Sequence, residues 1–163
     1  MRLLGLDYGS KTVGVAMTDP TLFLASPVET IKREDEVNLK QTVRRIRAIC
    51  EENDIHLIVL GLPLTMDGKI GKSAEKALAF QHRLERDLYL VRVIMEDERL
   101  TTWEATQPLL EAGIRRKSKR KEVVDQLAAR LILQQYIDNH SREEIEQEVE
   151  KAFHKKELRN ELS

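Results

Sequence analysis

The order of its apolar patterns is the feature that most restricts how this chain can fold. Three strand-like segments follow one another at the start of the sequence, and helical and strand periodicities alternate after them. We expect strands at residues 2–7, 12–19, 22–30, 56–61 and 88–96, and helices at 36–53, 73–87, 101–111 and 121–138. This order predicts an α/β domain with a mixed sheet that opens as a meander and carries helices on both faces.

The spacing of side chains inside these segments supports the assignment. Val13 and Val15 alternate with smaller residues, as in a strand, and apolar residues recur between positions 36 and 53 at the spacing of an amphipathic helix. Pro27 favours an edge position for the third strand. Ser73 is the expected N-cap of the second helix.

Composition limits the classes of protein that fit. The 163 residues suffice for one domain with a sizeable core, and the 27 basic and 28 acidic residues nearly cancel, so nucleic-acid binding would need a local basic patch. The single cysteine, Cys50, excludes an internal disulfide, and no histidine stands at zinc-ligand spacing. No apolar run approaches the roughly 18 residues of a membrane span, and no signal-peptide pattern opens the chain. We therefore expect a cytoplasmic protein that does not bind membranes.

An aspartate, Asp7, ends the first buried strand. It shares a strand face with Leu3 and Gly5, where a carboxylate is costly unless it is solvated, hydrogen-bonded or bound to a cation. The alternative is an aspartate that caps the glycine turn after it.

A second acidic group closes the last predicted strand. Glu96, Asp97 and Glu98 follow one another there, and Arg99 comes next. The strand end directs one or two of these carboxylates to the edge of the sheet. Alternatively, they complement the dipole of a helix that begins near Thr101.

The third acidic position is Asp125, inside the helix predicted at residues 121–138. It shares a helical face with Ala128, Ala129 and Ile132, so it faces the core side of its helix. The alternative is a buried ion pair with a lysine or arginine.

One explanation accounts for all three positions. Carboxylates that converge at one edge of a sheet repel each other, and a divalent cation removes that cost. Ligands that are all oxygen select a hard ion, Mg²⁺ or Mn²⁺, and two such ions can activate water and stabilise the leaving oxygen at a phosphodiester.

Basic residues occur where a phosphate backbone would pass these acids. Gly9 permits close approach of a phosphate, and Lys11 and Arg99 can hold phosphate oxygens. A basic loop is expected just before the Asp125 helix, although such a charge run can also be a solvated surface. Its cations are Arg115, Arg116, Lys117, Lys119, Arg120 and Lys121.

Four stretches of the chain together resemble the YqgF/RuvX family of bacterial RNase H-like nucleases, relatives of the Holliday-junction resolvase RuvC. They are "GLDYGSKTVGVAMTD", "IVLGLPLTMDG", "MEDERLTTWEA" and "VVDQLAARLILQQYID", in family order. The resemblance implies an RNase H-like fold with a five-stranded mixed sheet, its first three strands antiparallel, and helices on both sides. It covers residues 1–140, the expected nuclease domain, and leaves residues 141–163 as a charged helical tail that we expect to be exposed.

The resemblance also implies residue roles. By motif position, Asp7 and Asp125 correspond to catalytic metal ligands. The third ligand is less fixed, because RuvC has a glutamate at the end of the strand that here spans residues 56–61, where this chain has none. Glu98 is the favoured third catalytic ligand, with Asp97 as its substitute or partner at the metal.

The resemblance implies maturation of the 5′ end of the small-subunit ribosomal RNA precursor, with Holliday-junction resolution as the older proposal for the family. The expected partners are structured RNA, branched DNA or ribosomal precursor particles, and the chain is expected to be a monomer or homodimer. A catalytically weak nucleic-acid-binding module of the same fold remains an alternative. The hairpin "DYGSKTVGVA" also resembles that of actin-like ATPases and sugar kinases, but those need two such domains and this chain has room for one.

Overall fold

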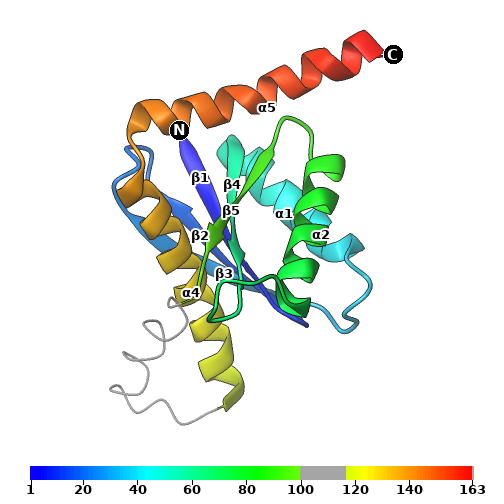
Figure 1. Cartoon of the computed structure of the whole chain (residues 1–163), viewed down its shortest axis with the longest axis vertical. Coiled ribbons are helices and arrows are strands. Elements are labelled where there is room, and N and C mark those ends of the chain that lie inside the picture. The colour runs from blue at the N-terminus through cyan, green and yellow to red at the C-terminus, as the bar shows by residue number, and fades with distance from the viewer. Residues whose placement is uncertain (100–116, 163) are drawn as a thin grey trace.

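A computed structural model of the chain describes the backbone of residues 1–99 and 117–162, and the side chains of residues 1–99 and 122–155. Within this part, one mixed sheet has the strand order β3-β2-β1-β4-β5 (Figure 1). The strands are β1 (Arg2–Tyr8), β2 (Thr12–Thr18), β3 (Ala25–Lys32), β4 (Ile55–Leu62) and β5 (Arg92–Asp97). The helices are α1 (Lys40–Asn53), α2 (Lys72–Asp87), α4 (Lys117–Asn139) and α5 (Arg142–Leu162).

The directions of the strands confirm the predicted mixed sheet. β1 pairs antiparallel with β2, and β2 pairs antiparallel with β3, whereas β1, β4 and β5 are parallel neighbours. The carboxyl ends of β1, β4 and β5 therefore lie at one edge of the sheet, where β1 ends at Tyr8 and Leu62 of β4 pairs with Asp97 of β5. This edge is where the sequence places its acidic residues.

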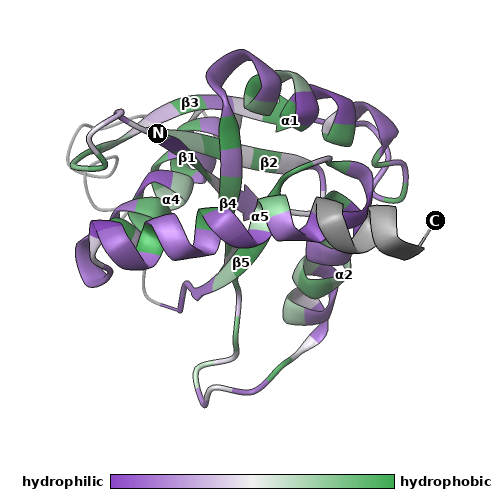
Figure 2. Ribbon diagram, turned by 90° about the horizontal axis from the view of Figure 1, so that it is seen from above, coloured by the Kyte–Doolittle hydropathy of each residue, from purple (hydrophilic) through white to green (hydrophobic). Residues whose placement is uncertain are grey.

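Helices cover both faces of the sheet, so the strands lie between α1 and α4 (Figure 2). Leu4 and Leu6 of β1 belong to the core shared with α1 and α2, and Leu3 belongs to the core shared with α4. Because side chains alternate along a strand, Asp7 lies on the α4 face with Leu3. The buried apolar side chains of both layers thus fix which side of the sheet receives the carboxylate.

Glycines allow α4 to approach the sheet closely. A Cβ added at Gly5 would lie 2.7 Å from Cβ of Leu133, and one added at Gly14 would overlap the backbone carbonyl of Asp125. Ala128 and Ala129 on α4 are also buried, as their helical spacing with Asp125 predicts. The close contact places Asp125 directly over β2, the neighbour of β1.

The charged tail forms α5, and it packs on the body of the protein. The amide of Ser141 donates to the carboxylate of Glu144, and the amide of Glu144 donates to the hydroxyl of Ser141, which is a capping box at the start of α5. Ile145 and Ala152 are buried, and Arg92 at the start of β5 donates to Glu148 at 2.7 Å. The expectation of an exposed helix is therefore wrong for these turns. α5 lies at the amino end of β1 (Figure 1), whereas Asp7 is near the carboxyl end of that strand.

Several boundaries differ from the sequence prediction, and α1 begins at Lys40 where a helix from residue 36 is expected. Residues 117–121 belong to α4 and are not a loop, because lysine and arginine are good helix formers. α2 begins with Gly71 as its N-cap, so Ser73 is not the cap. Residues 22–24 form a turn in which Asp19 accepts hydrogen bonds from the amides of Phe23 and Leu24, and β3 begins only after it.

Further expectations concern the edge strand, the start of the last strand and the remaining helix. β3 is the predicted edge strand and contains Pro27. Residues 88–91, expected to open the last strand, instead connect α2 to β5, and Leu90 adopts a positive φ of 58°. The helix expected at 101–111 lies outside the described residues. No helix in the described part of the chain is both long and apolar enough to span a membrane.

We expect Gly14→Ala to destabilise the protein by about 2 kcal/mol or more, because the new methyl group would overlap the backbone of α4 at Asp125. Gly71→Ala is the matched control, since its Cβ would meet only Cγ2 of Thr65 at 3.4 Å. Urea unfolding of the two variants measures the difference. Equal stability of the two would contradict the close packing of α4 on β2.

Candidate active site

Asp7 and Glu98 meet across the end of β4. Asp7 is the penultimate residue of β1, and Glu98 follows β5, with its amide donating to the carbonyl of Leu62 at 3.2 Å. Between them lies Gly61, where an added Cβ would overlap a carboxylate oxygen of Glu98. The missing side chain leaves room for Glu98 to lie over β4, and its carboxyl group hydrogen-bonds that of Asp7.

Asp125 reaches the same place from α4. In the sheet Asp7 pairs with Gly14, the glycine against which the backbone of Asp125 packs. The hydroxyl of Thr12 donates to Oδ2 of Asp125 at 2.7 Å and so fixes the direction of that carboxylate. The structure therefore brings together the three carboxylates predicted as catalytic.

Burial and mutual repulsion shift the acidity of this group. Burial raises the pKa of Asp7 to about 6, the hydrogen bond with Glu98 opposes that rise, and the charge of Asp125 adds to it. Burial and then the charge of Asp7 raise the pKa of Glu98 to about 9. Two carboxyl groups in such contact hold a proton between them at neutral pH.

The other two acids of the cluster have different partners. Asp97 forms an ion pair with Arg99, with 2.9 Å between Nη2 and Oδ2, and accepts from the amide of Arg99 at 3.1 Å. Burial acts to raise the pKa of Asp97, but the hydrogen bonds with Arg99 hold this pKa below its usual range. Glu96 accepts a hydrogen bond from Gln135 at 2.8 Å. The side chain that joins Asp7 is thus that of Glu98.

The three carboxylates offer the oxygen ligands that a hard cation binds, but they do not have the arrangement of metal ligands. Asp7, Glu98 and Asp125 offer only oxygen, which suits Mg²⁺ or Mn²⁺. The carboxyl groups of Asp7 and Glu98 are hydrogen-bonded to each other, and the carboxylate of Asp125 accepts a hydrogen bond from Thr12. Among the described residues no group of three or more His, Cys, Asp or Glu side chains has the arrangement of metal ligands. A cation here would have to displace the shared proton.

The residues predicted to hold phosphate lie around this edge. The amide of Gly9 donates to the carbonyl of Thr12 at 2.8 Å in the tight β1–β2 turn, and Lys11 is exposed beside it. Arg99, besides pairing with Asp97, donates to the carbonyl of Met66 at 3.4 Å. Lys117, Lys119, Arg120 and Lys121 lie in the first turns of α4. Arg115 and Arg116 lie outside the described residues.

Sequence reasoning missed Thr12 and the reason for the two glycines. A threonine at the start of a strand gives no sign that it holds a carboxylate more than a hundred positions away. Tyr8, the residue after Asp7, stacks on Phe80 with 4.2 Å between ring centroids.

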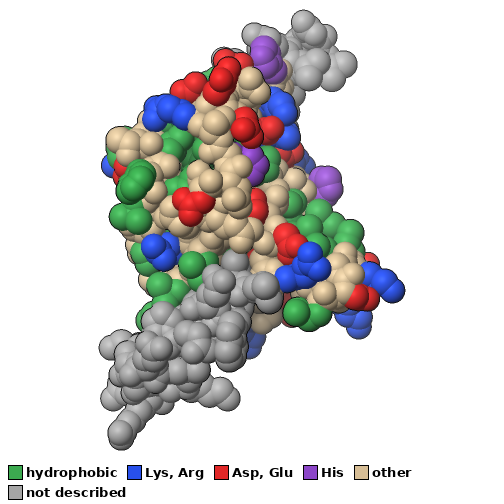
Figure 3. Space-filling model, turned by 60° about the vertical axis from the view of Figure 1, so that its left-hand side comes forward, with side chains coloured by type: hydrophobic (Ala, Val, Ile, Leu, Met, Phe, Trp, Pro, Cys, Tyr) green, Lys and Arg blue, Asp and Glu red, His purple; other side chains and the backbone are tan. Residues whose placement is uncertain are grey.

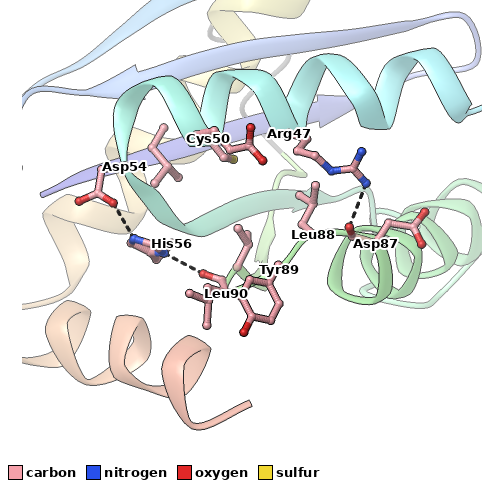
Figure 4. Close-up of a pocket in the computed structure, with 11 residues that line it drawn as sticks. Arg47, Cys50, Asp54, His56, Asp87, Leu88, Tyr89 and Leu90 are labelled. Carbon is pink, nitrogen blue, oxygen red and sulfur yellow. Dashed lines mark hydrogen bonds and ion pairs between the residues drawn. The ribbon is translucent and has the colours of Figure 1, made fainter. Parts of the chain in front are cut away.

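Two cavities differ in their position relative to the carboxylates: one lies beside them and the other does not. One of about 360 Å³ is bordered by Met66, Asp97, Arg99 and Gln135, next to the acidic edge. The other, of about 310 Å³, lies near the amino end of β4, where His56 bridges Asp54 and the carbonyl of Leu90 (Figure 4). None of the predicted site residues lines this second cavity.

Charges of both signs are mixed over the described surface that Figure 3 presents. This agrees with the net charge of −1 and with the expectation that any attraction for nucleic acid is local.

Comparison with known proteins assigns the family. A family model described as "RuvX: Holliday junction resolvase" matches residues 1–139, which is most of the chain. The chain belongs to the RuvX family. Its sheet order, with helices on both faces, is the RNase H-like fold that the resemblance implies. α5 lies beyond the matched residues.

RuvX-family relatives carry a functional name. A protein of Clostridium beijerinckii is 46% identical over 142 residues, which are 87% of this chain and 99% of the relative. One of Lachnospira eligens is 48% identical over 139 residues, 85% of this chain and 98% of the relative. Both are named "Putative pre-16S rRNA nuclease".

Solved structures include distant neighbours of this RuvX-family chain. RuvC of Thermus thermophilus has a TM-score of 0.46 and 17% identity, covering 81% of this chain and 92% of that one. The Holliday junction resolvase of fowlpox virus has a TM-score of 0.48 and 16% identity, covering 86% of this chain and all of that one, 100%.

Without divalent metal, we expect stability to fall as pH rises from about 5 to 9. The pKa values of Asp7 and Glu98 are raised by folding, so the folded state holds protons that the unfolded state has released, and this stability is lost as pH rises through the folded-state values. Urea unfolding in EDTA should show a loss of about 1 to 3 kcal/mol.

Glu98→Gln should flatten this pH dependence, because it removes the group with the more strongly raised pKa. Asp97→Asn is the matched control: the pKa of Asp97 is lowered, so its contribution is lost only as pH falls, and the slope between pH 5 and 9 should persist. A wild-type protein whose stability is independent of pH in this window would contradict the shared proton.

Proposed function

We propose that this protein is a metal-dependent nuclease that processes the 5′ end of the small-subunit ribosomal RNA precursor. The observation that carries the proposal is the convergence of Asp7, Glu98 and Asp125 at the carboxyl edge of the sheet. The name of its relatives, pre-16S rRNA nuclease, supports the choice of substrate. The proposed compartment is the cytoplasm, and the proposed partners are structured RNA and ribosomal precursor particles.

Asp7, Glu98 and Asp125 would hold the divalent ions in this proposal, with Asp97 as a neighbour that keeps Arg99 in place. Bound Mg²⁺ or Mn²⁺ would supply the activation of water and the neutralisation of charge on the phosphodiester, with two ions dividing these tasks. The protein prepares for this in three ways. Asp7 and Glu98 give up their shared proton, Thr12 orients Asp125, and the glycines at 14 and 61 let the carboxylates approach.

The nucleic-acid backbone would pass beside these carboxylates. Gly9 and Lys11 in the β1–β2 turn, and Arg99 after β5, are proposed to contact phosphates next to the cleaved one. The basic segment 115–121 would bind the backbone further along. Arg99 is held by Asp97, so its guanidinium is positioned before substrate arrives.

A Holliday-junction DNA endonuclease is the second candidate, and the description of the matching family favours it. Both candidates use the same carboxylates, so substrate choice decides between them. A homodimer would suit a junction, because two strands must be cut, whereas a monomer suffices for one RNA strand. A third possibility, a binding module without catalysis, predicts affinity without cleavage.

We expect the purified protein with Mg²⁺ or Mn²⁺ to cut a precursor RNA that spans the 5′ end of the small-subunit rRNA. Asp7→Asn and Glu98→Gln should each reduce cleavage about 100-fold or more while RNA still binds, and EDTA should have the same effect. Gel-based cleavage assays measure this, with a four-way DNA junction as the alternative substrate.

Asp138→Asn is the control for these variants, because Asp138 is exposed on α4 and lies at its far end from Asp125. It should cut as well as the wild type. Cleavage that survives EDTA, or that Asp7→Asn leaves intact, would contradict the proposed chemistry.

Binding through the basic segment should be steeply salt-dependent. Removing one cation that binds a phosphate should make the slope of log affinity against log salt shallower by about 0.7 for a single strand. The double variant Lys119→Gln and Arg120→Gln should therefore bind RNA more weakly with a shallower slope, as measured by fluorescence anisotropy from about 50 to 200 mM salt. An unchanged slope would remove this segment from the interface.

A further inference from the structure

A small hollow opens on the face of β1 opposite the carboxylates. It has a volume of about 100 Å³, and Tyr8, Gly9 and Ser10 border it on the β1–β2 side. Glu36, from the segment before α1, and Ser73 and Lys76, from the start of α2, complete the lining. This volume corresponds to roughly three water molecules, enough for one phosphate group and too little for a nucleoside.

A buried cation lies behind this hollow. Arg33 is 8% exposed, and its Nη2 donates to the carbonyls of Gly9 and Ser10 at 2.5 and 2.8 Å. Its guanidinium carbon lies 4.7 Å from the ring centroid of Tyr8. The head group of Arg33 thus contacts three of the residues that border the hollow.

The charge of Arg33 is not matched by an acid in contact with it. Its Nε and Nη1 are buried and have no hydrogen-bond partner, and no carboxylate among the described side chains forms an ion pair with it. Glu36 acts on Arg33 only through its charge and is itself hydrogen-bonded to Lys76. A buried guanidinium group with unsatisfied donors is costly. An anion near the turn would offset that cost, so Arg33 is an observation in favour of a ligand that is independent of the helix end.

The start of α2 adds to the positive potential. α2 has 16 residues, its N-cap is Gly71 in an extended conformation, and no side chain caps it. The amides of its first turn therefore lack a side-chain acceptor, and the positive end of the helix dipole faces the same region. Ser73 supplies a hydroxyl there.

Glu36 and Lys76 form the outer part of the hollow. Nζ of Lys76 donates to Oε1 of Glu36 at 2.6 Å, and both side chains are about half exposed. An exposed pair of this kind contributes little to stability, so exchanging it costs little. A phosphate could take the place of Glu36 as the partner of Lys76.

We propose that this hollow is a phosphate subsite, formed by Ser10, Ser73, Lys76 and the amides at the start of α2, with Arg33 as its buried counter-charge. The source of the phosphate rests on the proposed function: it is a phosphate group of the nucleic acid whose scissile bond lies at Asp7. Because Asp7 and Tyr8 are adjacent, the strand would bend around the end of β1, with one phosphate on each face of the sheet.

Binding of inorganic phosphate tests the subsite without reference to cleavage. In an NMR titration of the full chain, the backbone amides of Ser10, Ser73 and Ala74 should shift in a saturable manner. Lys76→Gln should weaken this binding about fivefold or more, because the variant cannot make a charge-assisted hydrogen bond to the phosphate. Lys151→Gln, which removes a lysine charge on α5, is the matched control and should bind phosphate like the wild type.

Arg33→Lys provides a second variant that keeps the charge but alters the hydrogen bonds with the turn, and its folding can be checked by circular dichroism. Unchanged phosphate binding in Lys76→Gln, or shifts confined to other parts of the protein, would overturn the subsite. If phosphate binds at the hollow but no metal-dependent cleavage is found, the subsite stands and the nuclease proposal falls.

Oligoribonucleotides then identify the source of the phosphate. In the Asp7→Asn background, Lys76→Gln should reduce the salt slope by about 0.7, as expected when one fewer phosphate of a single strand is neutralised. If the subsite holds a terminal phosphate, replacing the 5′-phosphate of the oligonucleotide by a 5′-hydroxyl should weaken its binding to the protein that retains Lys76. The same replacement should not weaken its binding to the Lys76→Gln variant. If it holds an internal phosphate, the two oligonucleotides should bind equally and Lys76→Gln should weaken both. An unchanged slope with both oligonucleotides would overturn the assignment to nucleic acid.

Discussion

The contact between Asp7 and Glu98 is the constraint on which the rest of this structure depends. Two carboxyl groups lie against each other at the end of a buried strand. Burial raises the proton affinity of both, and the charge of Asp7 raises that of Glu98 further, whereas the hydrogen bond with Glu98 lowers that of Asp7. Such a pair is costly for stability alone, since apolar residues could fill the same space. Its cost is understandable if folding prepares a site where a divalent cation replaces the proton.

The sheet and α4 are built to permit that contact. Gly61 leaves space over β4 for Glu98, and Gly14 lets the backbone of Asp125 approach β2. The buried residues of two core layers fix the helices on either face, so Asp7 is positioned by a strand and Asp125 by a helix. Glu98 directly follows β5 and is held to β4 by its amide, which donates to the carbonyl of Leu62. α5, which lies beyond the residues matched by the family, packs at the opposite end of the strands and leaves this edge open.

Much of this arrangement can be predicted from the sequence, because strand and helix periodicities place side chains on definite faces. The periodicity around Asp125 predicts the core side of its helix, and that is where the structure has it. The choice between Asp97 and Glu98 cannot be made from the sequence, since it depends on which carboxylate fits over Gly61, a contact between residues far apart in the chain. The prediction of a loop at residues 117–121 is wrong because it gives their charge more weight than their helix propensity.

Calorimetric titration with Mn²⁺ tests the central claim most directly. Repeated in buffers of different ionisation enthalpy at about pH 7.5, it reports both the affinity for the ion and the protons released. We expect wild-type protein to bind Mn²⁺ and release about one proton, the one shared by Asp7 and Glu98, and Glu98→Gln to bind weakly without that release. Failure of the wild type to bind the ion, or binding without proton release, would contradict the central claim.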